Sequence, residues 1–165
     1  MRVIIQRVTA ASVKVKDRII GEIGHGLLLL VGYEKEDTLE DISWVVRKII
    51  NMRIFNDGSN KMNLSLKEFN GDILLISQFT LFASTKKGNR PSFMNSAPQK
   101  IAEKWYENTI QEFEKLLEKD IQTGKFGAMM DVSIQNNGPV TLFIDSKNKE
   151  SNGRNYNKES PKNGG

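Results

Sequence analysis

A glycine–proline pair interrupts a segment that otherwise has the pattern of a β-strand. Residues 132–144 mix β-branched, apolar and short polar side chains in strand fashion, with Gly138 and Pro139 in their middle. Proline has no N–H group to donate to a sheet and is normally excluded from the interior of one. The pair therefore predicts a special backbone geometry, with a cis peptide bond as one form of it. We expect two strands, 131–135 and 140–144, to flank it.

Hydrophobic patterning predicts further strands, most of which precede the first helix. Alternating or continuous apolar runs are typical of strands. The run at 27–32 is apolar throughout, as in a strand at the centre of a sheet. Four strands are expected ahead of the first helix, and a fifth follows it. The predicted strands in this part of the chain are 3–8, 12–16, 19–23, 27–32 and 73–81.

Two main helices are predicted from their start signals and from helical spacing. The first begins near Asp37 or Thr38 and has an acidic capping-box partner three residues on. The second begins at Ser96, with Gln99 as its partner. Apolar side chains at helical spacing predict the buried face of each helix. These are Leu39, Ile42, Val45, Val46, Ile49 and Ile50 in the first, and Ile101, Trp105, Thr109, Phe113 and Leu116 in the second.

The composition excludes several classes of catalytic site. The chain has no cysteine and a single histidine, His25, which lies between two glycines in a predicted turn. Disulfides and thiolate chemistry are therefore excluded, and the common zinc-hydrolase ligand sets cannot be assembled from this chain. We expect no metal and no cofactor, and a reaction that proceeds without an imidazole base.

Charge and apolar content also bear on partners and location. The formal net charge is +4, but five basic and two acidic residues lie beyond residue 146, so the rest of the chain is nearly neutral. Contact with RNA must then use local basic clusters. No signal peptide or membrane-spanning stretch is predicted, and the expected location is the cytoplasm. The Asn/Lys-rich tail, 146–165, has too little apolar surface to fold and is predicted to be disordered.

A second motif closes the strand predicted at 73–81. Ser77-Gln78-Phe79-Thr80-Leu81 places two hydroxyls and an amide at the end of a buried run. Together with Gly138-Pro139-Val140-Thr141, in this order and spacing, it resembles the signature of the D-aminoacyl-tRNA deacylases. The resemblance covers roughly residues 1–145. It includes the segments Gln6-Arg7-Val8, Gly21-Glu22-Ile23-Gly24, Arg53-Ile54-Phe55, Lys61-Met62-Asn63, 87–93 and Thr123-Gly124-Lys125-Phe126.

The resemblance implies both a fold and a function. The fold is a single α/β domain, residues 1–145, with a mostly antiparallel, barrel-like sheet and two main helices, and it forms a homodimer. The function is hydrolysis of the ester bond of D-aminoacyl-tRNA to release the amino acid and free tRNA. This is a chiral proofreading step that acts on the acceptor end of the tRNA. Because steric exclusion of an L side chain cannot act on glycine, we also expect some hydrolysis of glycyl-tRNA.

Ester hydrolysis needs a positioned nucleophile and donors for the developing oxyanion. We expect backbone N–H groups near Gln78 and Phe79 to supply the donors. Thr80 either orients the nucleophile or attacks directly. Direct attack by threonine requires a nearby base, and the sequence offers no evident one, so we favour water or the 2′-OH of the tRNA. Without the resemblance, Ser77 and Thr80 would be read as ordinary strand hydroxyls.

A Gly138–Pro139 cis bond would place its flanking carbonyls on one side, as a rigid pair of acceptors for the substrate ammonium. The resemblance implies that this loop enters the partner subunit's pocket and leaves no room for an L side chain. A lone glycine–proline pair would otherwise be read as a strand kink. The residues with expected supporting roles are Ser77, Asn136 and Met129 in substrate binding, Arg7 and Thr141 in support of the loop, and Lys86, Lys87 and Arg90 as phosphate contacts.

Two rival functions remain open from the sequence. A nucleic-acid-binding protein without catalysis would suit a dimer with basic clusters, but it leaves the two motifs unexplained. A general esterase would cleave small D- and L-esters alike. For the supporting residues, Arg7 could instead be a surface arginine, Met129 and Phe79 core residues, and 85–90 a solvated loop.

Overall fold

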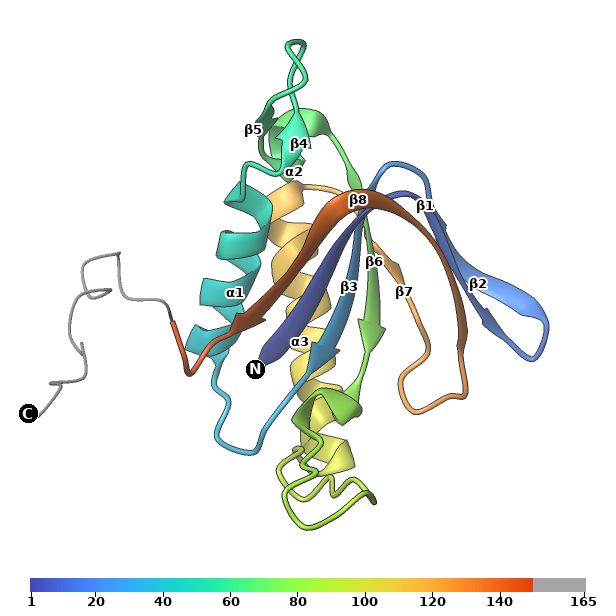
Figure 1. Cartoon of the computed structure of the whole chain (residues 1–165), viewed down its shortest axis with the longest axis vertical. Coiled ribbons are helices and arrows are strands. Elements are labelled where there is room, and N and C mark those ends of the chain that lie inside the picture. The colour runs from blue at the N-terminus through green and yellow to red at the C-terminus, as the bar shows by residue number, and fades with distance from the viewer. Residues whose placement is uncertain (150–165) are drawn as a thin grey trace, which may run out of the picture.

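A curved six-stranded sheet forms the centre of the molecule (Figure 1). The structure is a computed structural model that describes residues 1–149. The three long antiparallel pairings all involve the first strand, which pairs with the second, third and last strands of this sheet. The two remaining pairings are parallel. Its strands are β1 (Arg2–Val15), β2 (Arg18–Ile23), β3 (Gly26–Gly32), β6 (Asp72–Ser77), β7 (Gln122–Thr123) and β8 (Asp131–Asp145).

The sheet curls so far that it is nearly closed. β1 pairs with β8 along one edge and with β3 and then β2 along the other. β2 curves back toward β7, and a Cβ atom on Gly21 would lie 2.9 Å from the carbonyl oxygen of Thr123. Only glycine permits this approach of two backbones. The predicted barrel-like α/β domain is confirmed.

Two predicted strand pairs are each one continuous strand. The segments 3–8 and 12–16 belong to β1, and 131–135 and 140–144 belong to β8. The predicted breaks were wrong because the two strands pair with each other along almost their whole length and absorb their irregularities as bulges. Three strands therefore precede the first helix, where four were expected.

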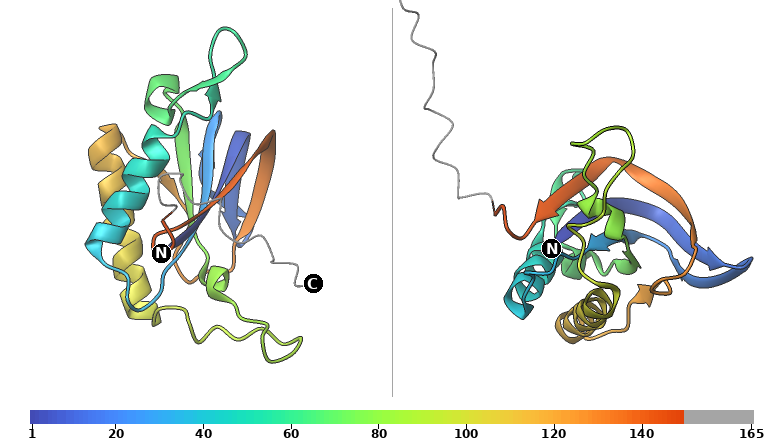
Figure 2. Two further views of the ribbon diagram at one scale, coloured as in Figure 1. Left: turned by 60° about the vertical axis from the view of Figure 1, so that its left-hand side comes forward. Right: turned by 90° about the horizontal axis from the view of Figure 1, so that it is seen from below.

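Helices cover one face of the sheet (Figure 2). α1 and α3 pack on the main core, which includes Leu29, Leu75 and Phe113, and a smaller core lies within the curl of the sheet. A short arm, β4–β5, extends from the end of α1 (Figure 1). The remaining elements are α1 (Leu39–Asn51), β4 (Phe55–Asn56), β5 (Met62–Leu64), α2 (Leu66–Phe69), the 3-10 helix η1 (Phe79–Phe82) and α3 (Gln99–Leu117).

The start of α1 follows the prediction and the start of α3 does not. Thr38 and Asp41 form the expected capping box. At α3 the N-cap is Pro98, without a side-chain cap, and the hydroxyl of Ser96 instead donates to the carbonyl of Phe79. Proline suits a helix start because it has no N–H group to leave unpaired.

The buried faces of the helices differ from the prediction at their first turns. Leu39 is 62% exposed and Ile101 37% exposed. Both lie in the first turn of their helix. In α3 the buried positions are Ala102, Tyr106, Thr109 and Phe113, so the buried face is centred beside the predicted one.

The part of the chain that the structure describes continues past the predicted domain boundary at residue 145. Ser146 is buried, and the ammonium of Lys147 pairs with Asp41 at 2.6 Å. Residues 150–165 of the predicted tail lie outside the described residues. Within residues 1–149, no helix combines the length and apolar character needed to cross a membrane.

Candidate active site

The first motif forms a turn rather than the end of a strand. β6 ends at Ser77, and η1 follows at once, so the predicted extension of the strand to Leu81 was wrong. The N–H group of Gln78 donates to the carbonyl of Val31 at 2.7 Å, after which the chain bends away from the sheet. A Cβ atom on Gly32 would lie 2.8 Å from the carbonyl oxygen of Gln78. The glycine therefore allows the turn to pass close to β3. We call residues 77–82 the Ser77–Phe82 turn.

Thr80 is held by the neighbouring amide. The side-chain amide of Gln78 donates a hydrogen bond to Thr80 Oγ1. An amide does not accept a proton at neutral pH, so this contact orients the hydroxyl without activating it as a nucleophile. Because η1 begins here, the N–H groups of Phe79 and Thr80 have no acceptor within the helix.

Aromatic and hydroxyl contacts fix the outer side of this turn. The ring of Phe79 is 57% exposed and stands edge-on to Phe93, with ring centroids 5.1 Å apart. The hydroxyl of Ser96 donates to the Phe79 carbonyl at 2.9 Å. Phe79 is therefore a surface residue, and its alternative reading as core is wrong.

A buried phenol anchors β6 just before the turn. Tyr106 Oη on α3 donates to the carbonyl of Leu75 at 2.7 Å. Burial raises the pKa of Tyr106 well above its ordinary value. The phenol is therefore neutral and supports the strand as a donor, while it cannot serve as a base near Ser77.

The second motif lies in a bulge of β8. The Gly138–Pro139 peptide is cis, as predicted. On β1, Gln6 pairs with Thr141 and Val8 with Asn136, so four residues of β8 lie opposite Arg7 alone. The proline therefore lies outside the ladder, where its missing N–H group costs nothing.

The side chain of Arg7 lies against this bulge and donates hydrogen bonds to it. It is only 6% exposed, so its reading as a surface arginine is wrong. Its guanidinium donates to the carbonyl of Asn137 at 3.3 Å, to the Asn137 side chain at 3.3 Å and to the carbonyl of Gly138 at 3.4 Å. It also donates to the carbonyl of Ile54 at 2.6 Å and to the side chain of Asn56 at 3.4 Å. One side chain thus joins the bulge to the β4–β5 arm.

Sequence reasoning missed several of these partners. Asn137, Ile54 and Asn56 received no role, although Arg53-Ile54-Phe55 was part of the resemblance. A buried arginine needs several acceptors, but nothing in the sequence says which backbone carbonyls will face it. Those acceptors depend on the position of the bulge.

The remaining predicted residues lie on the surface. Asn136 and Thr141 are exposed on either side of the Gly138–Pro139 pair, and Gln6 Nε2 donates to Asn136 Oδ1 at 3.5 Å. Met129 is 92% exposed in the loop before β8. Its alternative reading as a core residue is wrong. The predicted phosphate contacts are all exposed, and they lie in the loop after the Ser77–Phe82 turn. They are Lys86, Lys87 and Arg90.

The two motifs do not meet within one chain. In the sheet register, Ser77 lies beside Val31, whereas the bulge lies beside Arg7, which pairs with Leu27. The motifs are therefore separated by four residues along the strands, roughly 13 Å. They are also on β6 and β8, with β3 and β1 between them.

Comparison with known proteins identifies the family. The sequence model of the family described as D-Tyr-tRNA(Tyr) deacylase matches residues 4–145. The chain belongs to this family. Membership confirms the predicted resemblance and the predicted enzyme class, a hydrolase.

Relatives of this deacylase family match the chain over almost its whole described length. The D-aminoacyl-tRNA deacylase of Flavobacterium psychrophilum is 53% identical over 150 residues, which cover 91% of this chain and 100% of that protein. The D-aminoacyl-tRNA deacylase of Bacteroides thetaiotaomicron is 51% identical over 150 residues, with the same coverage.

Two solved structures share the fold. One, named c-Myc DNA Unwinding Element Binding Protein, has a TM-score of 0.82 and 42% identity, and the match covers 88% of this chain and 98% of that one. The other, described as a probable eukaryotic D-amino acid tRNA deacylase, has a TM-score of 0.77 and 17% identity. That match covers 87% of this chain and 97% of the other, and at this identity it shows the fold alone.

Proposed function

We propose that this protein hydrolyses the ester bond of D-aminoacyl-tRNA and releases a D-amino acid and free tRNA. The observation that carries the proposal is the Ser77–Phe82 turn, in a chain that belongs to this deacylase family. The turn presents two backbone N–H groups outside the hydrogen-bonded part of η1, beside a threonine hydroxyl held by Gln78. These are donors for an oxyanion and a group that positions a nucleophile.

The reaction is attack of water on the ester carbonyl, in which the bond to the ribose oxygen breaks and a proton of the water ends on that oxygen. Attack by the tRNA 2′-OH would only move the aminoacyl group to the neighbouring ribose oxygen, and water would still have to cleave the new ester. Thr80 Oγ1 positions the nucleophile, and its contact with an amide supports this role over direct attack. The N–H groups of Phe79 and Thr80 bind the oxyanion that develops on the carbonyl oxygen. A donor of this kind is worth about 3–4 kcal/mol in the transition state.

The chiral filter is assigned to the Gly138–Pro139 pair. Its carbonyl oxygens bind the ammonium of the substrate, and Arg7 holds the bulge in place. With the ammonium and the ester carbonyl both fixed, the side chain of a D-residue points outward to solvent. An L side chain would point into the backbone of the pair and is rejected. Glycine has no side chain to reject, and glycyl-tRNA is therefore also a substrate.

The filter requires a second copy of the chain. Because the two motifs lie on different strands and at different levels of the sheet, the Gly138–Pro139 pair of one subunit enters the pocket of its partner. β8 supports such a homodimer because it lies at an edge of the sheet and exposes Ile134, Leu142 and Phe143 at 40%, 38% and 59%. Exposed apolar edges are normally covered.

The acceptor end of the tRNA lies along the loop that follows the turn. Lys86, Lys87 and Arg90 are exposed there and contact its phosphates. Phe79 and Met129 present exposed apolar side chains for the terminal adenosine. Stacking of a base on an aromatic ring is a common mode of binding to single-stranded RNA.

The test compares D-tyrosyl-tRNA, L-tyrosyl-tRNA and glycyl-tRNA with D-tyrosine methyl ester. We expect rapid hydrolysis of the D-substrate, partial hydrolysis of glycyl-tRNA and no hydrolysis of the L-substrate. Equal cleavage of both enantiomers would indicate a general esterase. Binding of tRNA without release of any amino acid would indicate a nucleic-acid-binding protein.

A further inference from the structure

We propose that Arg2 is a positioning residue for the reaction, which holds the Ser77–Phe82 turn in its working geometry. This inference rests on the proposed location of the reaction at that turn. Arg2 lies at the start of β1, two strands away from β6, and received no role from the sequence.

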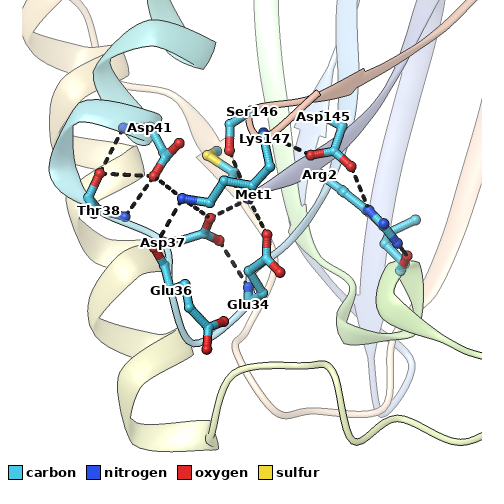
Figure 3. A network of polar contacts seen from close by, with 11 residues as sticks. Met1, Arg2, Glu34, Glu36, Asp37, Thr38, Asp41, Asp145, Ser146 and Lys147 are labelled. Atoms are coloured by element: carbon cyan, nitrogen blue, oxygen red, sulfur yellow. Dashed lines mark hydrogen bonds and ion pairs between the residues drawn. The ribbon is translucent and has the colours of Figure 1, made fainter. Parts of the chain in front are cut away.

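The guanidinium of Arg2 makes three contacts at once. Its Nε donates to Asp145 Oδ2 at 3.0 Å, and its Nη1 donates to the carbonyl of Leu81 at 3.0 Å. Its central carbon lies 4.5 Å from the centroid of the Phe82 ring. Figure 3 shows the guanidinium of Arg2 beside the carboxylate of Asp145. Two of the three contacts are to the residues that directly follow Thr80.

Asp145 is also held in place by contacts other than the one with Arg2. It lies opposite Arg2 in the ladder between β1 and β8, and its Oδ1 accepts the N–H group of Lys147 at 3.0 Å. Its side chain is 14% exposed and that of Arg2 is 35% exposed, so the ion pair is partly shielded from solvent. Arg2 therefore links the turn to a rigid part of the sheet.

The turn needs such a support because a four-residue 3-10 helix is weakly held by its own hydrogen bonds. Its other anchors are the bond from Gln78 to Val31, the bond from Ser96 to Phe79, and the buried ring of Phe82. Of these, only the Phe82 ring holds the part of the turn after Thr80, and Arg2 lies against that ring. If this part moved, the Thr80 hydroxyl and the preceding N–H groups would move with it.

The contacts require arginine in particular. A guanidinium is planar, donates in two directions and stacks on an aromatic ring. A lysine at this position would keep the attraction to Asp145 but could not bridge to the Leu81 carbonyl and stack on Phe82 at the same time. Arg2→Lys therefore distinguishes an effect of the positive charge from an effect of the contacts with Leu81 and Phe82.

The experiment measures steady-state deacylation of D-tyrosyl-tRNA and thermal unfolding for Arg2→Lys, Arg2→Met and Lys119→Met. Lys119→Met is the matched control because it removes an ion pair of similar length, 2.9 Å to Asp72, at the other end of β6. We expect both Arg2 variants to lower kcat roughly tenfold with KM within about twofold, because misplacement of reacting groups affects the chemical step. Lys119→Met should keep the wild-type kcat.

Two results would overturn the inference. One is a wild-type kcat in Arg2→Lys, which would show that charge alone suffices. The other is a lower unfolding temperature in the Arg2 variants with unchanged kcat, which would indicate a merely structural role. If Arg2→Met does not fold, Arg2→Lys decides the question alone.

Thr80→Ala, measured in parallel, separates this inference from the proposed function. A wild-type rate in Thr80→Ala would refute the positioning role that the proposed function gives to the Thr80 hydroxyl. A slow Thr80→Ala together with fast Arg2 variants would refute only the role of Arg2.

Discussion

At the scale of single residues, Arg7 has a demanding environment, because a charged side chain is here only 6% exposed. A buried guanidinium must find acceptors for its N–H groups, and here two backbone carbonyls of β8 and one of the segment before β4 supply most of them. The position of Arg7 opposite the bulge means that loss of these contacts would release the Gly138–Pro139 pair. It would also release the β4–β5 arm on the other side.

We predict that Arg7→Lys lowers the free energy of unfolding by roughly 1–3 kcal/mol, because several carbonyls lose their donor. We also predict a lower kcat/KM for D-tyrosyl-tRNA, since the bulge loses its support. Urea unfolding and deacylation kinetics measure the two effects. Arg53→Lys is the control, because Arg53 is exposed and donates to a single carbonyl, that of Asn63. Wild-type stability and rate in Arg7→Lys would refute the supporting role.

At the scale of elements, the start of α1 shows how a capping motif can bind a distant part of the chain. Asp41 accepts the N–H group and hydroxyl of Thr38, at 3.0 and 2.9 Å, and also the ammonium of Lys147. Figure 3 shows these groups gathered at the end of the helix, beside Ser146. Burial raises the pKa of Asp41, but the hydrogen bonds from Lys147, Thr38 and Ser146 outweigh it and lower the pKa to about 2.

This lowered pKa sets a direction for the pH dependence of stability. A carboxylate whose pKa is lowered by folding stabilises the fold above its unfolded pKa of 3.8, and the contribution is lost as the pH falls toward 2. We predict that Asp41→Asn lowers the free energy of unfolding by about 1–2 kcal/mol at pH 7. The difference from wild type should shrink as the pH falls from 4 to 2.

The matched control for this prediction is Glu40→Gln, in the same first turn of α1. Chemical unfolding of both variants between pH 2 and pH 7 provides the measurement. A difference between wild type and Asp41→Asn that stays constant over this range would contradict the assigned cause.

The elements also show what the sequence could and could not predict. The Thr38–Asp41 box was predictable because it depends on neighbouring residues alone. The start of α3 was not, because Ser96 bonds to the Ser77–Phe82 turn instead of to its own helix. The end of β6 was likewise hidden, since the bend after Ser77 depends on the contact between Gln78 and β3.

The same division holds for the candidate site. Both motifs, and the cis bond at Pro139, were found from local sequence and resemblance. The bulge that isolates Arg7, and the reach of Arg2 to Leu81, were not found because they depend on register between strands far apart in the chain. Local sequence patterns indicate candidate site residues, whereas the pairing of strands determines which groups those residues contact.

At the scale of the whole molecule, β8 is the element that most needs a partner. It is 15 residues long and most of its side chains are exposed. Within residues 1–149, only one of its edges is paired. Long exposed edges of this kind invite association with another chain. Under the proposed mechanism, the separation of the two motifs in one chain would give that association a function.

We predict that Phe143→Glu converts a homodimer into a monomer, because Phe143 is 59% exposed on β8 and a charge there would be buried on association. The variant should keep its fold and lose deacylation of D-tyrosyl-tRNA. Sedimentation equilibrium and circular dichroism give the two readouts. Leu39→Glu on α1, where the side chain is 62% exposed, is the control and should remain dimeric. A wild-type protein that sediments as an active monomer would refute the prediction.

The bulge and the apolar side chains lie on the same strand, β8. Association between copies of the chain and discrimination between mirror-image substrates would then depend on the conformation of one strand. A change that reshapes the contact between copies would also retune stereochemical accuracy, so the two properties are expected to drift together in evolution.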